Sequence, residues 1–90
     1  MGVTVFPNPF NPEVTVSFQL EQSSSVLISV YDLLGRRVRS LVDEPAQSAG
    51  HFQQTWDGRD DDGRQMASGK YFLTMDINGV KDSRKLTLIR

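Results

Sequence analysis

The densest group of side chains that could do chemistry lies between positions 57 and 63, where aspartates crowd onto a glycine-containing stretch. Oxygen ligands on a flexible turn suit a hard cation such as Ca²⁺. Counting back from Gly63 as the obligatory glycine of an EF-hand loop puts Gly58 where the first carboxylate belongs, and no glutamate follows at the bidentate position. We therefore expect a solvated turn, with calcium binding as the alternative. The aspartates concerned are Asp57, Asp60, Asp61 and Asp62.

No other group of residues has the pattern of an active site. His51 is the only histidine, and strand alternation turns it toward solvent. The serines at 23–25 lie in a loop without a G-x-S-x-G elbow, and no glycine-rich loop opens a helix to hold phosphate. Glu13, Glu21 and Glu44 lie at strand ends or in loops with no cleft implied. We expect no catalytic residue, no metal site and no cofactor, and thus no enzyme or small-molecule substrate.

Composition narrows the class of protein further. The chain has 90 residues, which is enough for one core, and 38% of them are hydrophobic. Its formal net charge of −1 gives no general attraction to nucleic acid, and no apolar run is long enough to span a bilayer. Cysteine is absent, so stability must come from packing. Without a secretory signal at its start, the chain is expected to be a piece of a longer protein.

Apolar residues recur with a period of two, which is typical of strands with one buried face. About seven short strands follow, and they predict an all-β fold, an immunoglobulin-like or fibronectin-III-like antiparallel β-sandwich. In this scheme Trp56 is the core anchor between the sheets, while Leu27, Tyr31 and Phe72 face outward. The expected strands lie at 3–6, 14–20, 26–30, 38–42, 52–56, 71–77 and 86–88.

Turn residues separate these strands. Asn78-Gly79 predicts a tight hairpin between the last two strands, and Asp32 to Gly35 predicts a type I turn closed by glycine. Prolines at 7, 9 and 12 predict a stiff peptide, so residues 1–12 are expected to form an N-terminal segment with an edge strand and a proline-rich tether. Residues 13–90 would form the sandwich, with at most a helical turn near Val42 to Gln47.

Several motifs together resemble the C-terminal sorting domains of type IX secretion substrates. These are Asn8-Pro9-Phe10-Asn11-Pro12, Tyr31-Asp32-Leu33-Leu34-Gly35-Arg36, Trp56-Asp57-Gly58-Arg59-Asp60, Ser68-Gly69-Lys70-Tyr71 and Lys85-Leu86-Thr87-Leu88. The resemblance implies a non-catalytic module that follows a cargo domain and directs it across the outer membrane. Its implied partners are an outer-membrane translocon and a sortase-like protease, and its implied location is the periplasm in transit to the cell surface or the extracellular space.

The same resemblance implies which residues a partner would recognise. A glycine-x-tyrosine starts the penultimate strand in that family, and a basic, apolar strand ends the polypeptide. The corresponding residues here, predicted to form the recognition surface, are Gly69, Tyr71, Lys85, Leu86, Leu88 and Arg90.

Two other functions remain open. The motifs at 56–60 and 67–71 are also similar to the immunoglobulin-like domain of flagellar hook-capping proteins, which takes part in filament assembly. A third alternative is an accessory or carbohydrate-binding module of a secreted glycosidase, which would need a row of exposed aromatic side chains. Only Tyr31 and Phe72 are candidates for such a row.

Overall fold

A computed structural model describes residues 3–7 and 13–90 of the chain, and in these residues the fold is all-β. The proline-rich tether predicted from the prolines at 7, 9 and 12 lies outside the described residues, apart from Pro7. No helix in the described residues has the length and apolarity needed to cross a membrane. The strands are β1 (Val3–Phe6), β2 (Val14–Leu20), β3 (Ser24–Tyr31), β4 (Arg37–Gln47), β5 (Gly50–Trp56), β6 (Gly69–Ile77) and β7 (Val80–Leu88).

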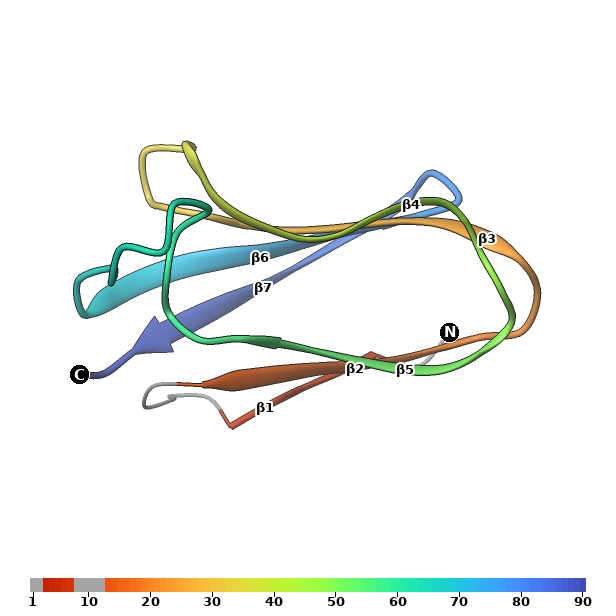
Figure 1. The fold of residues 1–90 in the computed structure, drawn as a ribbon, viewed down its shortest axis with the longest axis horizontal. Helices are drawn as coiled ribbons and strands as arrows, with labels where there is room; N and C mark the ends of the chain where they lie inside the picture. Colours follow the sequence, from red (N-terminus) through yellow and green to blue (C-terminus); the bar gives the residue numbers. More distant parts are fainter. Residues whose placement is uncertain (1–2, 8–12) are drawn as a thin grey trace.

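The seven strands form two antiparallel sheets that lie face to face (Figure 1). One sheet has the order β1-β2-β5 and the other the order β4-β3-β6-β7. β3 and β6 pair although more than 40 positions separate Ile28 from its partner Met75. This architecture confirms the predicted immunoglobulin-like β-sandwich.

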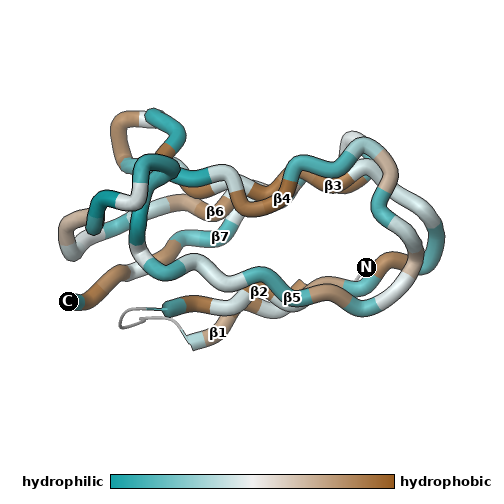
Figure 2. The backbone as a smooth tube through the Cα atoms, viewed as in Figure 1, coloured by the Kyte–Doolittle hydropathy of each residue, from teal (hydrophilic) through white to brown (hydrophobic). Residues whose placement is uncertain are grey.

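The core lies between the sheets and follows from the alternation along each strand. β2 and β6 each bury every second residue, and hydrophobic segments recur along the strands of both layers (Figure 2). Trp56 is fully buried, as predicted for the core anchor. Its ring packs edge-on against Tyr71 of the opposite sheet, with 5.3 Å between ring centroids. The largest fully buried side chains include Ile28, Leu73, Leu86 and Leu88.

Both predicted turns are confirmed. Asn78 (φ 52°) and Gly79 (φ 83°) connect Ile77 to its partner Val80 in a two-residue hairpin, since both residues tolerate positive φ. In the turn after β3, the backbone N–H of Gly35 donates to the carbonyl oxygen of Asp32 at 3.1 Å, and Gly35 has a φ of 81°.

The helical turn that the sequence allowed near Val42 to Gln47 does not form, because β4 continues through these residues. Asp43 and Glu44 pair with Leu27 and Val26 of β3. Pro45 does not interrupt the ladder, since β4 is an edge strand and a register shift leaves this position without a partner in β3. The extended pairing of β4 therefore outweighs the local turn preference.

β7 also begins earlier than the expected 86–88. Its first half is polar because it lies at an open edge of the sandwich. Asp82 and Arg84 occupy positions on the core side of β7, opposite the buried Met75 and Leu73. They form an ion pair of 2.6 Å with each other, and both side chains are about two-fifths exposed.

Candidate functional site

The predicted recognition residues do not form one exposed surface. Tyr71, Leu86 and Leu88 are buried in the core, with exposed fractions of 5%, 0% and 1%. Gly69 begins β6, as predicted for the glycine-x-tyrosine motif. Only Lys85 and Arg90 are exposed. A partner that contacts this end of the domain would therefore meet charged side chains, while the buried residues hold the strands in place.

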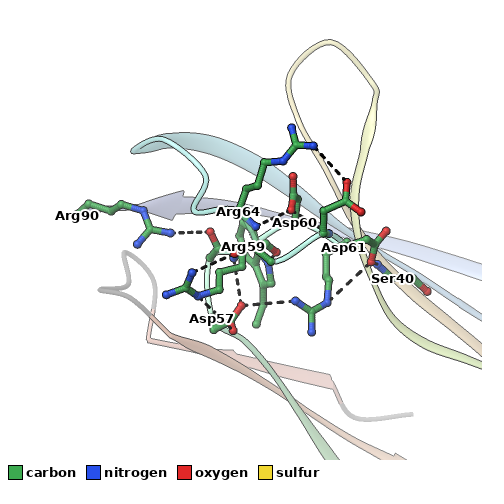
Figure 3. A network of polar contacts seen from close by, with 12 residues as sticks. Ser40, Asp57, Arg59, Asp60, Asp61, Arg64 and Arg90 are labelled. Carbon is green, nitrogen blue, oxygen red and sulfur yellow. Dashed lines mark hydrogen bonds and ion pairs between the residues drawn. The ribbon is translucent and has the colours of Figure 1, made fainter.

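Arg90 fastens the end of β7 to the loop between β5 and β6. Its Nη2 donates to the carbonyl oxygen of Gly58 at 2.6 Å, and its Nε donates to that of Met66 at 2.5 Å. The backbone N–H of Arg90 donates to Oγ of Ser68 at 2.9 Å. Figure 3 shows Arg90 reaching into this loop. The residues 57–68 and the chain end thus act as one structural unit, which we name the loop cluster.

The aspartates of the loop cluster are used to shape backbone. Oδ1 of Asp57 accepts the N–H of Arg59 at 3.1 Å. Oδ1 of Asp60 accepts the N–H groups of Asp62 and Arg64 at 3.0 and 2.8 Å. Such side-chain-to-backbone bonds are those of Asx-turns. The predicted solvated turn is therefore a hydrogen-bonded one, and no described group of three or more acidic, histidine or cysteine side chains is placed to hold a metal.

Arg39 and Asp61 connect the loop cluster to β4. Oδ1 of Asp61 accepts the N–H of Ser40 at 3.0 Å, and the N–H of Asp61 donates to the carbonyl oxygen of Val38. Arg39 lies 3.7 Å from Asp57 and 3.9 Å from Asp61 in ion pairs. Exposed ion pairs contribute little stability, so the two hydrogen bonds of Asp61 to the backbone of β4 are the main connection.

Two core aromatics also hold the loop cluster. Nε1 of Trp56 donates to the carbonyl oxygen of Arg59 at 2.8 Å, and Oη of Tyr71 donates to that of Ala67 at 2.6 Å. Burial raises the pKa of the Tyr71 phenol, with a smaller contribution from the Asp32 charge. The glycine-x-tyrosine motif therefore has a structural role: its ring packs on the tryptophan and its hydroxyl fixes the loop.

The turn after β3 projects two leucines into solvent. Leu33 and Leu34 are 63% and 77% exposed. Asp32 holds the turn, since its Oδ1 accepts the N–H groups of Leu34 and Arg36 at 2.9 and 3.0 Å. The backbone N–H of Arg36 is the main reason that the pKa of Asp32 is lowered, and the Arg36 guanidinium lowers it further.

His51 is exposed on the outer face of the three-stranded sheet, as the alternation predicted. Its Nε2 lies 3.0 Å from Oγ of Ser17 on the neighbouring strand. This contact is a cross-strand polar pair on an open sheet face, where Thr15 and Thr55 form a similar pair at 3.3 Å. It does not have the geometry of a nucleophile in a cleft.

A feature that the sequence analysis missed is a groove on the outer face of the four-stranded sheet. It has a volume of about 650 Å³, and residues of β3, β6 and β7 line it. Strand alternation predicts that Leu27, Tyr31 and Phe72 face outward, and the structure confirms this, with Leu27 44% exposed. The groove itself depends on which strands are neighbours, and the alternation within each strand carries no such information.

Comparison with known proteins gives a family match and several solved structures. The model of the FlgD Ig-like domain family matches residues 7–79. The search of curated proteins found no match. The structure of PorU from Porphyromonas gingivalis is similar over 97% of this chain, with 25% identity and a TM-score of 0.74. FlgD from P. aeruginosa is similar over 96% of this chain, which covers 71% of that protein, with 28% identity and a TM-score of 0.57.

PorZ from Porphyromonas gingivalis, an essential bacterial surface component of the type IX secretion system, shares the fold over 99% of this chain, with 24% identity and a TM-score of 0.70. The chain covers 12% of PorZ and 9% of PorU. It thus spans about a tenth of the length of these two proteins.

Proposed function

We propose a function for this chain, which belongs to the family of FlgD Ig-like domains. The proposed function is that of a non-catalytic sorting module of the type IX secretion system. It would direct a covalently linked cargo domain through an outer-membrane translocon, where a sortase-like protease acts. The module would be in the periplasm during transit and then at the cell surface or outside the cell.

The observation that carries this proposal is the likeness to PorU, which extends over nearly the whole module and is closer in shape than the likeness to FlgD. The occurrence of the same fold in PorZ, a surface component of that secretion system, supports it further. Both proteins are much longer than this chain, so the fold occurs there as a small part of a large polypeptide. A sorting module attached to a cargo domain would likewise be a small part of a long polypeptide.

Burial limits which of the predicted recognition residues a partner could contact. Leu86 and Leu88 would act by keeping β7 in the sheet, since their side chains are not accessible. The exposed Lys85 and the loop cluster held by Arg90 are the parts that a translocon could touch. Deleting residues 86–90 would remove core side chains as well as any signal, so it cannot separate recognition from folding.

Point variants make the test sharper. Residues 3–90 are fused to a periplasmic reporter in a bacterium with a type IX system, and surface exposure is measured by protease accessibility. Lys85→Glu reverses an exposed charge on the outer face of β7 and should reduce export. Gln53→Glu, an exposed change on the other sheet, is the matched control and should leave export unchanged. Leu86→Ala reports the effect of unfolding alone.

One result would overturn the proposal, and a second would overturn the part assigned to Lys85. If the unaltered module leaves the reporter in the periplasm, the module does not sort cargo. If Lys85→Glu is exported as well as Gln53→Glu while both remain folded, Lys85 takes no part in recognition. Circular dichroism of the purified modules provides the check on folding.

Hook assembly is the second candidate, favoured by the family match and by the 71% of FlgD that the chain covers. It makes a separate demand. A chimera of P. aeruginosa FlgD is made in which this module replaces the Ig-like domain. It should restore swimming in a strain that lacks FlgD. Immotile cells that contain a stable chimera would count against this function and leave the sorting proposal untouched.

A further inference from the structure

The outward side chains of the four-stranded sheet form three rows that cross the strands. In the middle row, Ser29 pairs with Ser40 on one side and with Thr74 on the other, and Thr74 pairs with Ser83. One small hydroxyl residue from each strand therefore stands in a line. Because strands in a sheet are about 4.8 Å apart, the line is about 14 Å long.

Larger side chains form the row on each side of this line. One flanking row is aromatic and basic, and consists of Arg37, Tyr31, Phe72 and Lys85. The other flanking row consists of Asp43, Leu27, Asp76 and Lys81. The groove of about 650 Å³ lies over β3, β6 and β7, where Ser29, Thr74 and Ser83 line it between Tyr31 of the first flanking row and Leu27, Asp76 and Lys81 of the second.

The groove floor is fixed and polar. Ser29 is 3% exposed at its base, and Oγ1 of Thr74 donates to the carbonyl oxygen of Ser29 at 3.4 Å. Ser83 is exposed, and its backbone N–H is occupied by Oδ1 of Asp82 at 2.8 Å. Serine and threonine hydroxyls both donate and accept hydrogen bonds. The floor can therefore match ligand groups that do the same.

Charge restricts the ligand class. Arg37 and Lys85 give one flanking row positive charge, although Arg37 also pairs with Asp61 at 3.8 Å. The other flanking row holds Lys81 beside Asp43 and Asp76, so charges of both signs stand close together on this face. A polyanion such as nucleic acid, or a polycation, would meet like charges as well as opposite ones. A neutral chain rich in hydroxyl groups is compatible with both flanking rows and with the floor.

We propose that this groove binds a short neutral oligosaccharide. The ring of Tyr31, which lines the groove, and that of Phe72, which pairs with Tyr31 on the neighbouring strand, are both half-buried and offer apolar faces on which a sugar ring stacks. The hydroxyls of Thr74 and Ser83 and the carboxylate of Asp76 exchange hydrogen bonds with the sugar hydroxyls. This site is on a sheet face, whereas the loop cluster lies between β5 and β6 and at the chain end. Lys85 is shared with the sorting proposal, but the stacking ring of Tyr31 and the hydroxyl side chains are not, so Tyr31→Ala tests glycan binding separately from sorting.

The test is a titration of the ¹⁵N-labelled chain with cellohexaose, laminarihexaose and mannohexaose, followed by NMR. At least one of them should shift the amide signals of residues in the three rows, with a dissociation constant between about 10 μM and 1 mM. Tyr31→Ala should weaken that binding about tenfold, because it removes a stacking face. Ser83→Trp fills the groove from an exposed position and should abolish the shifts.

Gln53→Trp places the same bulk on the outer face of the other sheet and should bind as the unaltered chain does. The proposal is wrong if none of the three hexasaccharides shifts the row residues, or if the shifts map only to the loops. It is also wrong if a heparin hexasaccharide binds the same residues as tightly, since the charge argument excludes that ligand. Thermal melts confirm that both tryptophan variants are folded.

Discussion

Trp56→Phe tests how the core and the loop cluster depend on each other. The indole is fully buried, packs on Tyr71 and donates to the carbonyl oxygen of Arg59 at 2.8 Å. Phenylalanine keeps an aromatic ring but removes the donor, which costs about 0.5–1.5 kcal/mol for a hydrogen bond of this kind. The smaller ring also leaves a cavity, for which about 1–3 kcal/mol is reasonable next to the 3–5 kcal/mol of a change to alanine.

The sum is about 1.5–4.5 kcal/mol, a large part of the roughly 5–15 kcal/mol that stabilises a typical domain. At about 4–8 °C for each kcal/mol, the melting temperature should fall by about 6–36 °C. Urea denaturation followed by circular dichroism measures the loss, and the midpoint should fall while the m-value stays constant. Phe72→Leu, a change of a half-buried ring on the outer face, is the control and should cost less than about 1.5 kcal/mol.

Hydrogen exchange adds a second measurement for the same variant. Losing the bond to Arg59 should speed exchange at the N–H groups of Gly63 and Arg64, which belong to the turn that follows. If Trp56→Phe costs less than about 1 kcal/mol, or exchange in the loop is unchanged, the tryptophan does not couple the core to the loop as described.

Three further outcomes are expected. Arg90→Ala should speed amide exchange across residues 57–68 relative to β5, because two hydrogen bonds to backbone carbonyl oxygens are lost. The control is Arg64→Ala, whose side chain is 79% exposed and which should not change the rates. Equal rates in both variants would refute the fastening role of Arg90. Because the pKa of Asp32 is lowered, its contribution to stability is present above about pH 4 and is lost as pH falls through the folded-state pKa. The melting temperatures of Asp32→Asn and the unaltered chain should therefore converge in acid. A difference that stays constant with pH would contradict this. The raised pKa of Tyr71 means that stability is fully present below about pH 10 and is lost as pH rises through the folded-state pKa, and a phenol that titrates late in alkaline absorbance should vanish in Tyr71→Phe.

The strands were predictable because burial repeats with the period of the backbone. Val14 to Leu20 shows the full alternation, and the structure places that strand within the same bounds. β4 was predicted too short, since Asp43 and Glu44 have no apolar alternation and extend only because β3 lies beside them. Turns fixed by positive φ, such as Asn78-Gly79, were also predictable, because the requirement is local.

The candidate sites were less predictable for a physical reason. Leu86, Leu88 and Tyr71 match a family motif, yet matching says nothing about whether a side chain faces a partner or the core, and here they face the core. The groove depends on register between strands distant in sequence, as when Ser29 meets Thr74. One sequence contains no direct signal for such pairing, so rows across a sheet become visible only in the folded chain.

The ion pair of Asp82 and Arg84 bears on how the module behaves when many copies are crowded together. The first half of β7 is an edge strand, where a strand of another polypeptide could pair with it and begin aggregation. Such pairing would remove water from the partly exposed side chains of Asp82 and Arg84, and their dehydration costs several kcal/mol. The chain thus carries its own safeguard against aggregation at the place where its backbone is most vulnerable.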